Sequence, residues 1–183
     1  MRSRAKIIDA TLGLIADEGF RGVSIASVAL AAGVSRQTVY SVFGTREDLV
    51  SQSMIALASE VFAEIRQSLE SIGDPAEFVV ELIVVARTTV RAHPVLATLL
   101  RGDADNPLNE DDVIERAKPI AYEILSPMKA MHPDIEPMMD DILQMGVRLA
   151  LSVILFDDAT IRADDDLRRF LFRWLAPALP RKP

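Results

Sequence analysis

The stretch of sequence that decides the fold is Ser24–Leu49, which reads SIASVALAAGVSRQTVYSVFGTREDL. Ser24 is of the residue type that caps the N-terminus of a helix, and Gly33 suits the left-handed conformation in which a helix ends. Ser35 then caps a second short helix, which Gly44 closes. A turn this short holds the second helix across the first. The pattern predicts a helix-turn-helix, the arrangement that presents one helix to the major groove of DNA.

The same residues resemble the DNA-binding part of TetR-family transcriptional repressors. The resemblance is carried by the run Ala32-Gly33-Val34-Ser35, by the pattern Thr38-x-Tyr40-x-x-Phe43 and by Arg46, a basic residue that opens a long helix. With the preceding helix it covers residues 1–50. It implies a three-helix DNA-binding domain followed by a helical domain that binds a ligand and dimerises. One position departs from the family, because Ala26 stands where many relatives carry Arg.

Side chains of the second helix are the expected readers of DNA. Arg and Gln pair with guanine and adenine edges, and the hydroxyls of Thr and Tyr suit phosphate oxygens. The capping serines stand at helix N-termini, which attract phosphates, and the resemblance implies a phosphate contact for Arg46. The predicted DNA-binding residues are Ser24, Ser35, Arg36, Gln37, Thr38, Tyr40 and Arg46. The alternative is a plain solvent face, with Arg46 in an ion pair to Glu47 or Asp48.

The charge of the chain is unevenly distributed. Its formal net charge is −7, but residues 1–50 carry six basic and five acidic side chains, so the acidity belongs to the remainder. An acidic C-terminal part repels nonspecific polyanions. The composition therefore disfavours an architectural DNA binder, which would be strongly basic, and leaves room for a reader that depends on a few well-placed contacts.

The rest of the chain has helical periodicity, and no segment alternates like a strand. The sequence predicts an all-α fold with a helix-turn-helix domain over residues 1–46 and a helical regulatory and dimerisation domain over residues 47–183. Helices are expected over residues 4–18, 45–72, 75–92, 94–100, 135–156 and 165–178. A further helix should begin at Asn106 or Asn109 and be kinked or divided by Pro119 and Pro127.

The segment Leu149–Phe156 is apolar on every side. A helix of that kind is expected to be buried all round, and in a chain of 183 residues one face most readily meets a second subunit. The resemblance implies that the last two helices of each subunit form a four-helix bundle. The predicted dimer-interface residues are Leu149, Val153, Phe156, Phe170 and Trp174. The alternative is a core within one chain.

A small-molecule effector is expected from the resemblance, in a cavity bounded by the long helix and those that follow it. Such cavities hold a few polar groups that orient the ligand, and the candidates are Arg91, His93 and Tyr122. Several methionines lie between residues 128 and 145, where they fill a core or line a cavity for a variable apolar ligand. His93 precedes a proline, so its simpler interpretation is a polar residue at a helix break.

Other classes of function find little support. The chain has no cysteine and no acid pair, nucleophile triad or glycine-rich phosphate loop, so neither a cofactor nor a metal is expected. Its basic start leads directly into an amphipathic helix, which predicts a cytoplasmic protein without a membrane partner. The expected function is a ligand-released repressor that binds a palindromic operator as a homodimer. The alternatives are a transcriptional activator and a helical enzyme fused to a DNA-binding module.

Overall fold

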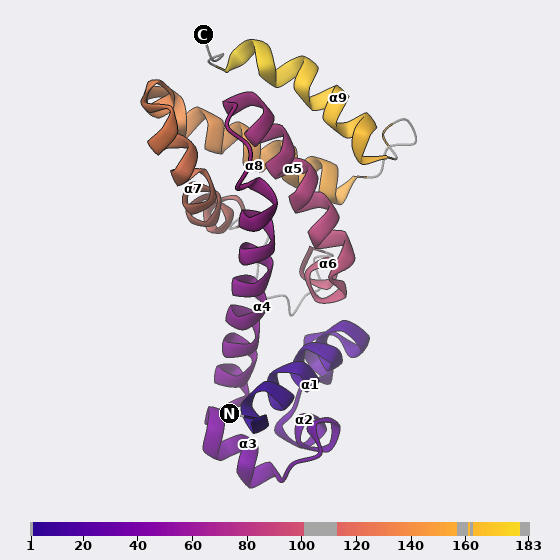
Figure 1. Ribbon diagram of the computed structural model, residues 1–183. Coiled ribbons are helices and arrows are strands. Elements are labelled where there is room, and N and C mark those ends of the chain that lie inside the picture. Colours follow the sequence, from indigo (N-terminus) through magenta and orange to yellow (C-terminus); the bar gives the residue numbers. More distant parts are fainter. Residues whose placement is uncertain (1, 101–112, 157–160, 162, 180–183) are drawn as a thin grey trace. The chain divides into compact units, whose positions relative to one another are not determined.

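The computed structural model describes residues 2–100, 113–156, 161 and 163–179, and within these residues the chain is helical and has no strand (Figure 1). The all-α prediction is confirmed. The helices are α1 (Arg2–Glu18), α2 (Ile25–Ala32), α3 (Arg36–Phe43), α4 (Arg46–Leu69), α5 (Pro75–Ala92), α6 (Pro94–Leu100), α7 (Val113–Met131), α8 (Met139–Leu155) and α9 (Asp164–Leu175), with short 3-10 turns η1 (Phe20–Gly22), η3 (Pro133–Met138) and η4 (Ala176–Ala178). The helix start expected at Asn106 or Asn109 lies outside the described residues.

The chain forms two compact units. The first contains α1 to α3, the part of α4 up to Val61, and α6; the second contains the rest of α4 with α5, α7, α8 and α9. The division expected between residues 46 and 47 falls where α4 begins, whereas the first unit continues along α4. The long helix therefore contributes residues to both units.

The first unit is held together by α1, which packs against α2, η1 and α6, and by the contact of α2 with α3. Its helices have buried apolar faces at the spacing that helices require. The fully or nearly fully buried side chains include Ile7, Ile15, Val28, Val39, Phe43, Leu49 and Val95. Arg4 adds a polar connection, because its guanidinium lies 5.5 Å from the centre of the Phe43 ring and donates to Gln52 Oε1 at 3.0 Å.

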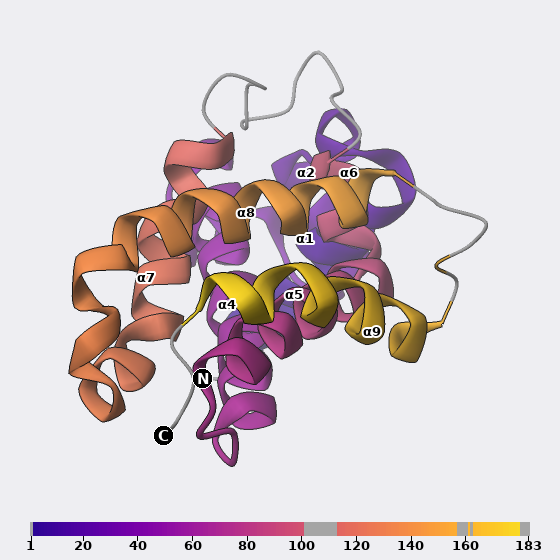
Figure 2. The same cartoon turned by 90° about the horizontal axis from the view of Figure 1, so that it is seen from above.

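The second unit is built around α5, against which both α8 and α9 pack (Figure 2). The two arms of the Arg168 guanidinium donate to the Glu81 carboxylate at 2.7 and 2.6 Å, which ties α9 to α5. These hydrogen bonds raise the pKa of Arg168 above its ordinary value. Arg87 of α5, whose side chain is 6% exposed, donates to Asp164 at 3.5 Å and to the carbonyl of Ile161 at 3.1 Å.

The helix α7 runs through both of its prolines without being divided. A proline leaves the carbonyl four residues earlier without its helical donor. For Pro127 that carbonyl belongs to Glu123, and the Ser126 hydroxyl donates to it at 2.9 Å. The local side chain thus replaces the missing backbone donor, which explains why a division expected from the sequence does not occur there.

Among the helices in the described part of the chain, none combines the length and the apolar character needed to cross a bilayer.

Candidate nucleic-acid interface

The helix α2 begins in a closed capping box. Ser24 has extended backbone geometry, and its hydroxyl accepts a hydrogen bond from the Ser27 amide at 3.0 Å, while the Ser27 hydroxyl accepts one from the Ser24 amide at 2.9 Å. The Ser27 hydroxyl also donates to the carbonyl of Gly22 at 2.9 Å. These bonds satisfy amides that the first turn of a helix leaves without partners. They fix where α2 starts relative to the turn before it.

The turn between α2 and α3 depends on Gly33, which has φ 65° and ψ 38°. This is the left-handed region that glycine adopts at little cost. The amide of Val34 donates back to the carbonyl of Ala29 at 3.0 Å, which closes the end of α2. Ser35 then caps α3, because its hydroxyl accepts from the Thr38 amide at 3.0 Å. Both caps and the glycine turn lie where the sequence predicts them.

The short helix α3 separates its residues into two faces. Val39 and Phe43 are buried, at 0% and 4% exposure, and they hold α3 on the core of the first unit. Arg36, Gln37 and Tyr40 are exposed on the other side. A row of a guanidinium, an amide and a phenol on one exposed face can donate to and accept from base edges and phosphates.

The other four residues predicted to bind DNA are Ser24, Ser35, Thr38 and Arg46, and they differ in their exposure and in their hydrogen-bond partners. Ser24 and Ser35 are exposed caps, and Thr38 is half-buried with its hydroxyl 2.8 Å from that of Ser35. The Arg46 guanidinium donates through Nε to the carbonyl of Val23 and through Nη2 to that of Phe20, each at 2.6 Å. The structure therefore brings the α3 residues together on one face, and gives Arg46 protein partners.

An apolar cavity of about 230 Å³ lies inside the second unit. Its walls come from the end of α4 and from α5, α7 and α8, and they include Ile65, Leu82, Ile83, Ala86, Ile120, Ala121, Ile124, Leu143, Gly146, Ala150 and Ile154. None of the residues that line it carries a charge. The interior is therefore suited to hydrocarbon, since an unpaired polar group in such a space is costly.

The three polar residues predicted to bind the effector do not line this cavity. Tyr122 is 43% exposed on α7. Arg91 is exposed on α5 and donates to the carbonyl of Val153 at 3.4 Å. His93 belongs to the first unit.

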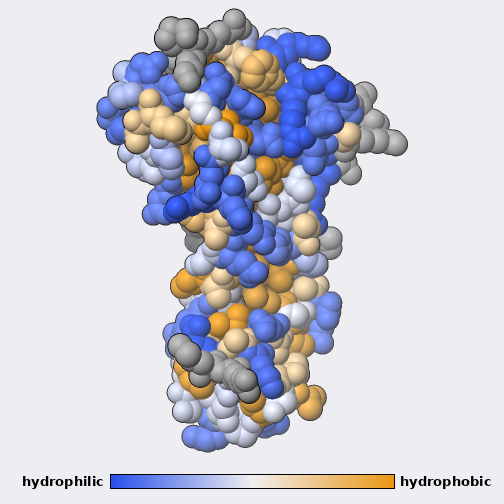
Figure 3. All heavy atoms as spheres, viewed as in Figure 1, coloured by the Kyte–Doolittle hydropathy of each residue, from blue (hydrophilic) through white to orange (hydrophobic). Residues whose placement is uncertain are grey.

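The outer faces of α8 and α9 expose large apolar side chains. Phe156 is 71% and Trp174 is 68% exposed, with Met145 and Phe170 also accessible and Leu149 and Val153 half-buried. The expectation that Leu149–Phe156 is buried on every side is thus not met within one chain. On the face drawn in Figure 3, hydrophobic side chains likewise reach the surface between hydrophilic ones.

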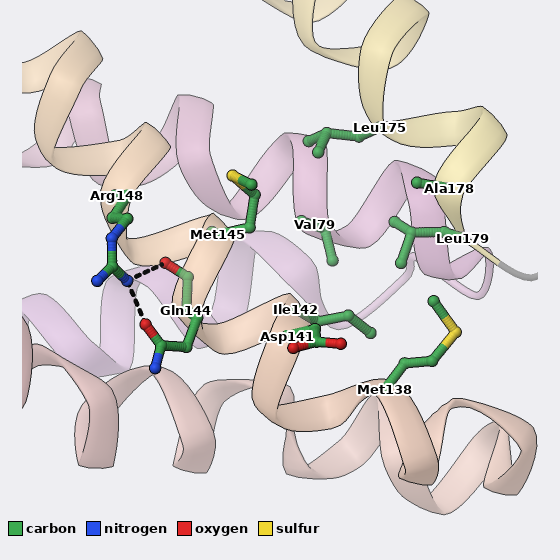
Figure 4. Close-up of a pocket in the computed structure, with 11 residues that line it drawn as sticks. Val79, Met138, Asp141, Ile142, Gln144, Met145, Arg148, Leu175, Ala178 and Leu179 are labelled. Atoms are coloured by element: carbon green, nitrogen blue, oxygen red, sulfur yellow. Dashed lines mark hydrogen bonds between the residues drawn. The ribbon is translucent and has the colours of Figure 1, made fainter.

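A groove lies between α8 and the end of α9. Met145, Ile142, Leu175 and Leu179 form its apolar part, and Arg148 donates to the backbone carbonyl of Gln144 at 3.1 Å at one end (Figure 4). Met145 lines this groove and is also one of the exposed apolar side chains of α8, so the groove adjoins the apolar outer face of that helix.

Comparison with known proteins agrees with the helix-turn-helix geometry. Residues 7–52 match the model of the family described as bacterial regulatory proteins, tetR family. The matched residues, which contain the helix-turn-helix, are therefore similar to a TetR-type DNA-binding domain. The transcriptional regulator AlkX of Mycobacterium tuberculosis is 29% identical to this chain over 102 residues, which are 55% of this chain and 48% of AlkX. The match thus spans about half the length of that relative.

Solved structures extend the similarity to the whole TetR-family fold. The TetR family repressor AlkX from Dietzia sp. strain DQ12-45-1b has a TM-score of 0.56 at 25% identity, covering 96% of this chain and 94% of that one. A transcriptional regulator from Rhodococcus sp. Rha1 has a TM-score of 0.64 at 20% identity, covering 98% and 99%. These proteins are regulators rather than enzymes. The family match and the similar folds agree with a helix-turn-helix of the DNA-binding type in this chain.

Two structural features of this protein are not in the sequence-based prediction. The first is a capping box at α4, in which the Asp48 amide donates to the Thr45 hydroxyl at 3.0 Å and that hydroxyl donates to the Asp48 carboxylate at 2.7 Å. A threonine followed three residues later by an acid is a recognisable signal for such a box. The second is the pair of carbonyls that Arg46 contacts, for which the sequence contains no local signal.

Proposed function

We propose that this TetR-family regulator is a repressor that binds a near-palindromic operator as a homodimer and is released by an apolar effector. The observation that carries the DNA-binding assignment is the exposed polar face of α3, formed by Arg36, Gln37 and Tyr40 on a helix whose other face is buried. A helix positioned this way enters the major groove with its N-terminal residues against base edges.

Within that assignment, the residues have different roles. Arg36 and Gln37 lie in the first turn of α3 and read base edges. Tyr40 and Thr38 contact phosphates, and the exposed helix starts at Ser24 and Ser35 hold phosphates through their backbone amides. Base readers determine the preferred operator, whereas phosphate contacts set the orientation of the helix.

The homodimer is supported by the apolar outer faces of α8 and α9. Phe156, Trp174 and Phe170 are too large and too exposed for a stable monomer surface, since contiguous apolar patches mark interaction sites. The predicted interface is completed by Leu149 and Val153. A two-fold dimer presents two copies of α3 to half-sites about 34 Å apart, or a multiple of that distance.

The effector is proposed to occupy the apolar cavity of the second unit. Because an engineered cavity of about 150 Å³ binds benzene, about 230 Å³ has room for a somewhat larger hydrocarbon group. The Dietzia repressor AlkX is implicated in biodegradation of n-alkanes, which favours an alkyl-containing compound. Ile65 of α4 lines the cavity, and Arg46 begins the same helix in the first unit. To move the regulator from 1:99 to 99:1, an effector needs about 5.5 kcal/mol of differential affinity.

The DNA-binding proposal is tested on an operator selected by the wild-type protein from a random duplex pool. Arg36→Ala and Gln37→Ala should each weaken operator binding by about 1–3 kcal/mol and weaken binding to a scrambled duplex far less. Gln67→Ala, at an exposed position of α4 in the second unit, is the matched control and should bind as wild type. An unchanged operator preference in both α3 variants would rule out α3 as the reader.

The effector proposal is tested by thermal unfolding with alkanes from hexane to decane and with glycerol as a polar control. A ligand at a free concentration one hundred times its dissociation constant raises the free energy of unfolding by about 2.7 kcal/mol. For a chain of this size, this raises the melting temperature by about 5–10 °C. Ala150→Leu fills the cavity and should remove the effect while keeping operator binding. The control Ala130→Leu changes an exposed position of α7. Stabilisation that persists in Ala150→Leu would place the ligand elsewhere.

A further inference from the structure

The corner between η1 and α2 concentrates three backbone carbonyls that need donors. Phe20 and Val23 are 8% and 2% exposed, so their carbonyls have little access to water. A buried carbonyl without a donor is costly. The Gly22 carbonyl between them accepts from the Ser27 hydroxyl at 2.9 Å. The Phe20 carbonyl accepts only a long backbone hydrogen bond, from the Val23 amide at 3.4 Å. Both it and the Val23 carbonyl also accept from a side chain in a distant part of the sequence.

That side chain is Arg46, the first residue of α4. Its Nε donates to the Val23 carbonyl and its Nη2 to the Phe20 carbonyl, both at 2.6 Å. A guanidinium presents these donors in a fixed planar fork, which an ammonium cannot reproduce. The third nitrogen, Nη1, lies 3.8 Å from the Glu47 carboxylate, an exposed contact of small expected value.

We propose that Arg46 is a positioning residue that joins the start of α4 to the start of α2, and that it is not a contact to DNA phosphate. The proposal rests on the DNA-binding function proposed above. If Arg46 turned to a phosphate, the carbonyls of Phe20 and Val23 would both lose their charged donor. With Nε and Nη2 held by the corner, only Nη1, which lies 3.8 Å from the Glu47 carboxylate, is left for another partner.

The contacts at this corner link the DNA-reading helix α3 to α4. The capping box of Ser24 and Ser27 fixes α2 to this corner, and Gly33 fixes α3 to α2. Arg46 connects the corner to α4, whose far end lines the apolar cavity at Ile65. A displacement of α4 therefore acts on α2 and α3 through the Arg46 contact as well as through the chain at Gly44.

The experiment compares Arg46→Met, Arg46→Lys and the control Glu47→Gln, which removes the neighbouring exposed ion pair but leaves both carbonyl contacts. Each protein is unfolded thermally and is titrated, at a temperature where circular dichroism shows it folded, with the selected operator at several salt concentrations. A phosphate contact adds about 0.9 to the salt slope, so a dimer that loses two contacts loses about 1.8.

A positioning role predicts that Arg46→Met and Arg46→Lys both melt about 3–10 °C lower than wild type. Both should bind the operator at least about tenfold more weakly although folded, with an unchanged salt slope, and Glu47→Gln should match wild type. A salt slope reduced by about 1.8 in Arg46→Met with recovery in Arg46→Lys would overturn the proposal. If wild type bound no DNA, the proposed function would fail, and the melting temperatures alone would still decide whether Arg46 supports the corner.

Discussion

Trp174 offers the most direct test of the dimer. It is 68% exposed on α9, one turn after Phe170, whereas Phe172 is 48% exposed and projects from another side of the same helix, where it lines a shallow groove with Glu81 of α5. We expect Trp174→Glu to give a folded monomer and Phe172→Glu to remain a dimer. Both changes replace an exposed aromatic with the same charged residue, and they alter different faces of α9.

The expected effect follows from the area that a partner would cover. A large aromatic side chain buries about 150–250 Å². With 68% of Trp174 accessible in the single chain, about 100–170 Å² remains to be covered, worth about 2.5–4 kcal/mol at 25 cal/mol per Å². A two-fold dimer contains this contact twice. Because 1.4 kcal/mol is a factor of ten, the dimer dissociation constant should rise about a thousandfold or more.

Sedimentation equilibrium over a range of protein concentrations measures this constant, and circular dichroism establishes that each variant is folded. Loss of the dimer should also abolish tight operator binding, because one subunit reaches only one half-site. A Trp174→Glu protein that dimerises like wild type would refute the proposed interface. Equal dissociation of Phe172→Glu would show that the effect does not depend on the face of α9.

Three further outcomes concern stability, each measured by urea unfolding. Ser53→Ala should raise the free energy of unfolding by about 1 kcal/mol, since the Ser53 hydroxyl is buried without a hydrogen-bond partner. Thr45→Ala should lower it by about 1 kcal/mol through loss of the capping box at α4, and Asp48→Ala should have a similar effect. Asp164→Ala should cost about 2 kcal/mol because it leaves the Arg87 guanidinium buried without its carboxylate; Arg87→Met, which removes the buried charge itself, should cost less. Equal costs for the last two variants would contradict this account.

The parts of the fold that the sequence predicts well are those decided by neighbouring residues. The caps at Ser24 and Ser35 and the turn at Gly33 require only a few consecutive residues with suitable hydroxyls and backbone freedom. The same local logic extends to Thr45 and Asp48, whose spacing is a capping signal. The starts of α2 and α3 and the helix-turn-helix are therefore accessible from the sequence, whereas the helix expected over residues 135–156 begins only at Met139, after a 3-10 turn.

Contacts between distant residues are not accessible in this way. Arg46 donates to the backbone carbonyls of Phe20 and Val23. Because every residue has a backbone carbonyl, the sequence does not indicate which ones a distant side chain contacts. The effector cavity poses a similar difficulty. Small residues such as Ala121 and Ala150 line it together with larger apolar ones, and periodicity does not reveal which inward positions leave space unfilled.

The composition of α8 has a physical reason that only the structure provides. One side of this helix carries Leu143, Val147 and Ile154 in the wall of the cavity, and the adjoining side carries Leu149 and Val153 in the apolar face proposed for the dimer. The segment Leu149–Phe156 meets both demands and is therefore apolar, although it is not buried on every side in one chain. An effector in the cavity and a partner subunit on the outer face would contact adjoining sides of α8. On the proposed function, the position of α8 would then depend on both the effector and the partner subunit.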